Sequence, residues 1–113
     1  MSCLFCRIVN REIPASIVYE DDRILAFNDI GPKAPHHILV IPKRHIATLN
    51  DLAAAEDGLV GEIVRRAAAI AKDLGVHESG YRTVFNTNSD GGQTVFHLHL
   101  HLLGGRPMEW PPG

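Results

Sequence analysis

The chain has neither an excess of basic residues nor a long apolar run. Its 113 residues include 11 Lys and Arg against 13 Asp and Glu, a formal charge of −2, so we expect no basic surface that would hold a polynucleotide. The apolar stretches are short or interrupted by charge, which argues against a membrane-spanning segment, and the start lacks the pattern of a signal peptide. We therefore expect a single cytoplasmic domain over residues 1–113, with no polynucleotide partner and no membrane association.

Cysteine is also scarce, because Cys3 and Cys6 are the only two in the chain. A disulfide between them would close a very small loop and stabilise the fold little. A thioredoxin-like redox motif follows a strand within a βαβ unit, and no strand is predicted before this pair. The spacing therefore favours half of a metal site over a redox pair. Two reduced cysteines packed as small hydrophobic side chains are the remaining alternative.

Hydrophobic periodicity predicts an α+β fold with a mainly antiparallel sheet of about five strands. Residues 3–13 predict a short helix, and residues 52–74 predict one long amphipathic helix with Gly75 as its C-cap. The predicted strands cover residues 16–20, 24–28, 37–41, 81–86 and 94–103. Because residues 37–41 are almost continuously apolar, both faces of that strand should be covered.

The run from Thr94 to Leu103 is the most informative stretch of the sequence. Because alternate side chains of a strand share a face, it places His97, His99 and His101 together and three leucines on the opposite face, which the long helix should cover. The imidazoles would be about 6.6–6.8 Å apart, so repulsion should leave one ring protonated and a neighbour neutral near pH 7. Such a row suits a displacement reaction, a zinc site, or merely a histidine-rich polar face.

Other polar positions are ambiguous when the residues are considered alone. Gly91, Gly92 and Gln93 offer either backbone N–H groups for phosphate oxygens or an ordinary tight turn. Asp29 fits the start of a loop and Ile30 fits a core position, while Asn86 stands at the predicted end of a strand.

The stretch His97-Leu98-His99-Leu100-His101-Leu102-Leu103 resembles the His-φ-His-φ-His-φ-φ signature of the histidine triad (HIT) superfamily, where φ is apolar. The resemblance to the Hint branch covers most of the chain. It includes Asp29-Ile30, residues 35–43, Asn86, residues 89–93, Gly104-Gly105-Arg106 and the terminal Trp110-Pro111-Pro112-Gly113. Members of that branch are homodimeric nucleoside phosphoramidases with a HIT-like fold.

The resemblance implies a two-step reaction on the α-phosphorus of a purine nucleoside 5′-phosphoramidate or a related nucleoside monophosphate conjugate. His99 would attack phosphorus and form a nucleotidyl-histidine, which water then hydrolyses. His101 would stabilise the phosphoryl charge and help in proton transfer. His37 would support the triad through hydrogen bonds, and Thr94 would lie near the leaving group, where many relatives carry serine.

The implied ligand is a purine nucleotide such as AMP or GMP. Asp29 would accept hydrogen bonds from the ribose hydroxyls, and Ile30 would pack on the base. Asn86 would lie on the phosphate or leaving-group side. Gly92 and Gln93, with Thr94, His99 and His101, would complete the nucleotide site.

The resemblance also implies a closed, structural zinc site made by Cys3, Cys6, His45 and His97. With His97 a metal ligand, His99 and His101 remain for chemistry. The tail 104–113, with Trp110, is expected to help shape the active site of the partner subunit in a homodimer.

Three other functions stay open at this point. One is a dinucleoside polyphosphate hydrolase of another HIT branch, and one is a non-catalytic protein that binds nucleotide or zinc. A metallohydrolase using all three triad histidines is disfavoured, because no carboxylate is predicted at a convincing general-base position beside them.

Overall fold

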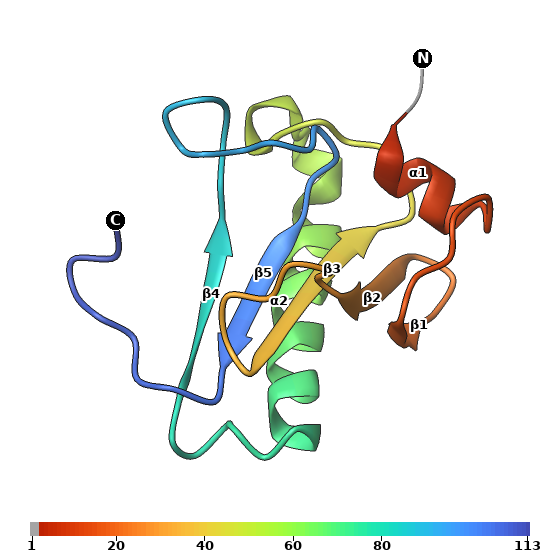
Figure 1. The fold of residues 1–113 in the computed structure, drawn as a ribbon. Helices are drawn as coiled ribbons and strands as arrows, with labels where there is room; N and C mark the ends of the chain where they lie inside the picture. The colour runs from red at the N-terminus through yellow and green to blue at the C-terminus, as the bar shows by residue number, and fades with distance from the viewer. Residues whose placement is uncertain (1–2) are drawn as a thin grey trace.

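The computed structural model describes residues 3–113, so residues 1–2 of the predicted domain lie outside the described range. Its elements are α1 (Leu4–Val9), β1 (Ile17–Glu20), β2 (Ile24–Asn28), β3 (His36–Pro42), the 3₁₀ turns η1 (Leu49–Asp51) and η2 (Ala54–Glu56), α2 (Asp57–Asp73), β4 (Tyr81–Phe85) and β5 (Leu100–Gly104). The strands form one sheet in the order β1-β2-β3-β5-β4, with every neighbouring pair antiparallel (Figure 1). The predicted α+β architecture is confirmed.

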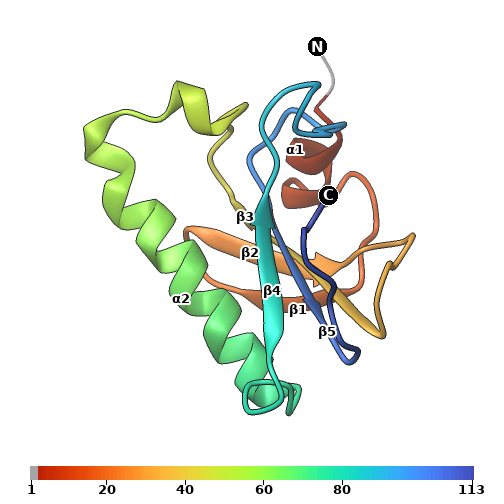
Figure 2. The same ribbon diagram turned by 90° about the vertical axis from the view of Figure 1, so that its left-hand side faces the viewer.

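The sheet lies between the two helices, with α2 against one face and α1 against the other (Figure 2). Ile38, Val40, Leu100 and Leu102 are at most 1% exposed and pack in the cluster that contains the buried side of α2. Full burial of such a side chain is worth about 1.5–3 kcal/mol. The prediction that the long helix covers the leucine face is therefore confirmed. The prediction of a doubly covered strand is confirmed too, because β3 is buried from His37 to Pro42.

Helix α2 begins at Asp57, five residues later than the predicted range. The side chain of Glu56 accepts a hydrogen bond from the N–H of Ala53 at 2.7 Å, which holds a separate 3₁₀ turn just before the helix. At the other end Gly75 has a φ of 77°, and its N–H donates to the carbonyl of Lys72 at 3.0 Å. The predicted glycine C-cap is therefore confirmed.

Strand β5 begins at Leu100, so residues 94–99 of the predicted strand 94–103 lie outside it. The neighbouring strand β3 ends at Pro42, which has no N–H, and the Pro42 carbonyl is occupied by the ring of His97. The ladder with β3 therefore stops at Leu100. The predicted alternation still holds, because Leu98 is buried on the α2 side and His97 contacts Phe5 of α1 on the other.

Among residues 3–113, no helix combines the length and the hydropathy that a bilayer crossing needs.

Candidate active site and metal centre

The pairing of β3 with β5 brings His37 next to His101. Leu39 is opposite His101 and His37 is opposite Leu103, so the two histidines are diagonal neighbours on the α1 face of the sheet. His37 Nε2 and His101 Nδ1 are 2.9 Å apart, a hydrogen-bond distance. His99 follows in the row, with its ring centroid 4.8 Å from that of His101. The predicted histidine row on one face is therefore present, although only His101 belongs to a regular strand.

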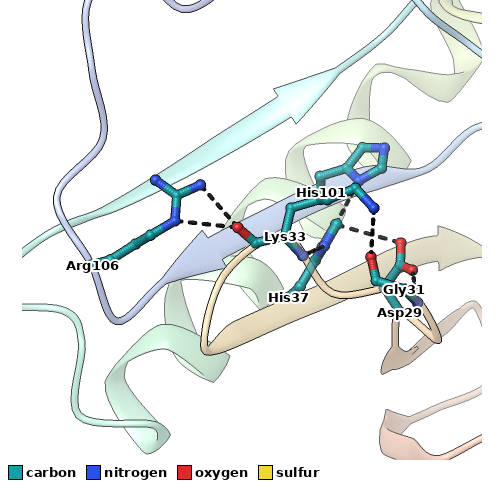
Figure 3. A network of polar contacts seen from close by, with 6 residues as sticks. All are labelled: Asp29, Gly31, Lys33, His37, His101 and Arg106. Carbon is teal, nitrogen blue, oxygen red and sulfur yellow. Dashed lines mark hydrogen bonds and ion pairs between the residues drawn. The ribbon is translucent and has the colours of Figure 1, made fainter.

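A backbone donor fixes which nitrogen of His37 carries the proton. The N–H of Lys33 donates to His37 Nδ1 at 3.0 Å (Figure 3), so this nitrogen is unprotonated. The neutral ring therefore carries its proton on Nε2 and donates it to His101 Nδ1. His101 in turn must carry its own proton on Nε2. The pair ends in an N–H donor on the far nitrogen of His101.

His99 has the opposite tautomer from His101. Its Nδ1–H donates to the backbone carbonyl of His97 at 2.7 Å, which leaves the Nε2 lone pair unprotonated. The ring is 93% buried, and Phe5 packs edge-on against it with ring centroids 5.2 Å apart. The row thus presents a nucleophilic nitrogen on His99 beside a hydrogen-bond donor on His101.

The pKa values of His37, His99 and His101 are all lowered, mainly because burial disfavours the charged ring. For His101, burial followed by the neighbouring His99 and His37 lowers the pKa to about 4. The prediction that one ring of the row is protonated near pH 7 is therefore wrong. That prediction considered repulsion between rings, whereas desolvation by burial is the larger cause and acts on every ring.

His97, at the other end of the row, contacts residues at the start of the chain. Its Nε2–H donates to the carbonyl of Pro42 at 2.8 Å, so Nδ1 is the free nitrogen. That Nδ1 lies 3.4 Å from Cys3 Sγ, 3.5 Å from Cys6 Sγ and 3.3 Å from His45 Nδ1. The sequence-predicted ligands are therefore all brought together, and their four ligand atoms lie within 4.8 Å of one another.

These separations fit a tetrahedral zinc ion. With bonds of about 2.0–2.1 Å to nitrogen and 2.3 Å to sulfur, the edges of the tetrahedron are about 3.3 Å between nitrogens and about 3.5 Å between nitrogen and sulfur. The 3.3 Å between the His45 and His97 nitrogens and the 3.4 Å from Cys6 Sγ to His45 Nδ1 match both values. The N–H of Cys6 also donates to Cys3 Sγ at 3.3 Å. The four residues form a possible metal centre with no open position.

Asp29 also lies beside the histidine row. Its Oδ2 is 3.5 Å from His37 Nε2, and its Oδ1 accepts from the N–H of Gly31 at 2.8 Å (Figure 3). Asp29, His37 and His101 could be considered a second metal cluster. However, the 2.9 Å between the two imidazole nitrogens is a hydrogen-bond length, shorter than the edge of about 3.3 Å that zinc requires.

An apolar hollow of about 360 Å³ opens between α1 and the sheet. Phe5 lines it and also contacts His99, so the hollow adjoins the histidine row. Its polar members are Asn28, Asp29 and Thr94. Ile30 also lines it and is fully exposed, so the alternative of a core position for Ile30 is wrong.

The glycine loop forms a tight turn. The N–H of Gly92 donates to the carbonyl of Ser89 and that of Gln93 to the carbonyl of Asn88, both at 3.0 Å. The buried Gln93 side chain accepts from the N–H of Asn88 and donates to the carbonyls of Ala47 and Val95. These backbone donors therefore serve the loop itself. The roles of Gly92, Gln93 and the half-buried Asn86 in binding remain predictions.

Sequence analysis did not assign a role to three residues of the site. Phe5 lies within the predicted first helix, and it packs against both His97 and His99. Lys33 acts through its backbone N–H, and Arg106 holds the Lys33 carbonyl. A backbone donor such as the Lys33 N–H leaves no pattern in the side-chain sequence. The alternating histidines were therefore the only sequence signal for this region.

Known proteins are similar to this chain in sequence and in fold. A family model described as "Scavenger mRNA decapping enzyme C-term binding" matches residues 2–110. An uncharacterized HIT-like protein of Synechococcus elongatus is 57% identical over 110 residues, covering 97% of this chain and 96% of that protein. The purine nucleoside phosphoramidase of Escherichia coli K12 is 51% identical over 105 residues, covering 93% of this chain and 88% of that protein.

The crystal structure of a HIT family hydrolase from Legionella pneumophila Philadelphia 1 has a TM-score of 0.98 at 58% identity, covering 99% of this chain and 100% of that one. The row of histidines, the fold and these relatives agree. The chain belongs to the HIT family and is a HIT family hydrolase.

Proposed function

We propose that this hydrolase cleaves purine nucleoside 5′-phosphoramidates or related nucleoside monophosphate conjugates through a nucleotidyl-histidine on His99. The observation that carries the proposal is the 2.7 Å hydrogen bond from His99 Nδ1–H to the His97 carbonyl. It leaves Nε2 as an unprotonated nucleophile, next to a donor on His101. The name of the 51% identical E. coli relative, purine nucleoside phosphoramidase, supports the same substrate class.

In the first step, His99 Nε2 forms a bond to the α-phosphorus and the phosphorus–nitrogen bond of the substrate breaks. The negative charge on the phosphoryl oxygens is stabilised by His101 Nε2–H, whose opposite nitrogen is occupied by His37. The departing amine needs a proton, and Thr94, exposed beside the hollow, would lie near it. In the second step water attacks phosphorus and frees His99. Overall one water is consumed, with a proton on the amine and a hydroxyl on phosphorus.

The apolar hollow is suited to a purine. Its walls from α1 and the sheet would contact the base, with Ile30 packing on one side. Asp29 has Oδ1 held by the N–H of Gly31, which leaves Oδ2 to accept from the ribose hydroxyls. Asn86, Gly92 and Gln93 are proposed to lie on the phosphate side.

The four-residue metal centre is proposed to hold a structural zinc ion. Cys3, Cys6, His45 and His97 would supply four protein ligands, so the ion would join the start of the chain to the sheet and would take no part in the reaction. The proposed division of the row is therefore one histidine for structure and two for chemistry.

A homodimer is proposed on the basis of exposed aromatic residues and the tail. Trp110 is 82% exposed and Phe96 is 48% exposed. Burial of one such side chain is worth about 1.5–3 kcal/mol. In such a dimer, the tail 104–113 of one subunit would lie near the active site of the partner subunit.

The test is rapid-quench mass spectrometry of the protein mixed with adenosine 5′-phosphoramidate. Wild type should show a transient adduct of one adenylyl mass, and His99→Gly should show none while retaining AMP binding. Wild type that binds AMP without an adduct or AMP release would indicate a nucleotide-binding protein instead. Faster turnover of diadenosine polyphosphates than of the phosphoramidate would indicate the dinucleoside polyphosphate branch.

A further inference from the structure

Arg106, two residues after the last strand, forms an unusual contact with the loop that precedes β3. Its Nε and Nη2 both donate to the backbone carbonyl of Lys33, at 3.2 and 2.9 Å (Figure 3). A planar guanidinium with two donors on one acceptor fixes the position of that acceptor more closely than a single amine can. The carbonyl of Lys33 is therefore held by a residue 73 positions later in the chain.

Gly105 makes this contact possible. Its φ is 94°, and a Cβ added there would lie 2.8 Å from Cβ of Pro35. The chain therefore turns tightly against the loop one residue before Arg106. The close approach and the paired donors are two independent signs that the segment after β5 is built to meet residues 33–35.

The same residue that Arg106 holds determines the state of the histidine pair. The backbone N–H of Lys33 donates to His37 Nδ1 at 3.0 Å, and His37 Nε2 is 2.9 Å from His101 Nδ1. Each of these two hydrogen bonds determines which nitrogen of the next ring carries the proton. A shift of Lys33 would release His37 Nδ1 and permit the other tautomer in both rings.

We infer that Arg106 is a positioning residue, which holds Lys33 so that His37 keeps its proton on Nε2 and His101 presents Nε2–H to the substrate phosphate. The effect on turnover rests on the proposed function. The effect on the tautomers does not, because it concerns the ligand-free protein.

A simpler role for Arg106 is to anchor the tail. Its Nη1 donates to the carbonyl of Pro107 at 3.1 Å. Arg82 makes a comparable contact, because its Nη2 donates to the carbonyl of Glu109 at 2.9 Å. Arg82 holds the tail and not the loop, so the Arg82→Gln variant separates the two roles.

The first readout is the tautomer of each imidazole in the zinc-loaded protein at neutral pH, measured by long-range ¹H–¹⁵N correlation NMR. In wild type, His37 and His101 should each show a protonated Nε2 and an unprotonated Nδ1. In Arg106→Gln, both rings should move toward a mixture of tautomers. Arg82→Gln should keep the wild-type pattern of tautomers. So should Arg65→Gln, a second control that removes a charge from α2.

The second readout separates kcat from KM for adenosine 5′-phosphoramidate. Arg106→Gln should lower kcat by about tenfold or more, because an ill-placed donor in the transition state costs rate. KM should change by less than about threefold, since Asp29 keeps its own backbone contacts. Arg106→Lys should recover part of kcat, since one donor can still reach the carbonyl.

Unchanged tautomers in Arg106→Gln would overturn the inference, whatever the activity. A raised KM with unchanged kcat would do the same, because it would indicate only a looser loop. So would an equal loss of kcat in Arg82→Gln, because the tail would then account for the effect. If wild type forms no adduct, the proposed function fails, yet the tautomer measurement still decides the role of Arg106.

Discussion

Substitution of Cys6 by serine removes one of the four proposed zinc ligands and leaves His37, His99 and His101 unchanged. Cys6 Sγ lies 3.4 Å from His45 Nδ1 and 3.5 Å from His97 Nδ1, so it forms one corner of the tetrahedron. A serine hydroxyl is a far poorer zinc ligand than a thiolate. We expect Cys6→Ser to lose zinc during purification, and the double variant Cys3→Ser with Cys6→Ser to lose it completely.

The stability cost follows from the linkage between binding and folding. An ion that binds only the folded chain stabilises it by about 4 kcal/mol when its free concentration is about 1,000 times Kd. For a domain of this length, each kcal/mol changes Tm by about 4 °C. We therefore expect Cys6→Ser to melt about 15 °C below wild type in a zinc buffer, and the difference to shrink when both proteins are treated with a chelator.

The chemical step should be affected less than stability. The His97 ring would bind the metal, but its backbone carbonyl orients His99, and that carbonyl is unchanged in Cys6→Ser. Zinc content by elemental analysis, Tm by calorimetry and kcat at a temperature where both proteins are folded give the three quantities. His77→Gln, at an exposed histidine outside the cluster, is the control. Wild-type zinc content in the double variant, or a wild-type Tm indifferent to the chelator, would refute the zinc assignment.

Three further predictions concern the nucleotide site and the loop. Asp29→Asn should raise KM for adenosine 5′-phosphoramidate by about tenfold through a weakened ribose contact, and steady-state kinetics with the 2′,3′-dideoxy analogue should show no such difference from wild type. The folded chain binds a proton on His101 only near pH 4, whereas the unfolded chain does so near pH 6.5. Stability should therefore fall as the pH drops below about 6.5, and His101→Gln should reduce the loss between pH 7 and pH 5 by about 2 kcal/mol in urea titrations. Gly105→Ala should lower the free energy of unfolding by about 1–3 kcal/mol, because its φ is 94° and the new Cβ meets Pro35. A Gly58→Ala control, where a Cβ meets nothing within 4 Å, should show no loss.

Much of the fold could be predicted because local signals agree with tertiary burial. The two-residue period of the leucines and histidines was enough to assign opposite faces, even where no regular strand forms. The spacing also gave the correct helix end, since Gly75 adopts the positive φ that its position requires. The errors occurred where a single side chain interrupts a pattern. Glu56 holds a separate turn before α2, and Pro42 ends the ladder that would have continued through His99.

The candidate site was less predictable than the fold, because its chemistry depends on backbone groups. The histidine row could be identified from side-chain types alone, whereas the full set of four proposed metal ligands came from the family resemblance. The members of each group do lie together. The protonation states could not be obtained from the same pattern. They depend on how deeply each ring is buried and on backbone groups such as the N–H of Lys33, neither of which has a sequence signature.

The histidines of this site present different ring nitrogens because their backbone partners differ. A carbonyl faces Nε2 of His97 and Nδ1 of His99, whereas an N–H faces Nδ1 of His37. His97 is left with an unprotonated Nδ1 that faces the possible metal centre, and His99 with an unprotonated Nε2. His37 becomes a donor toward His101. Three chemically identical side chains thus suit three different proposed roles, a metal ligand, a nucleophile and a hydrogen-bond donor, without any difference in residue type. It follows that a change of backbone geometry near Pro42 or Lys33 would alter the chemistry of a histidine that is itself unchanged.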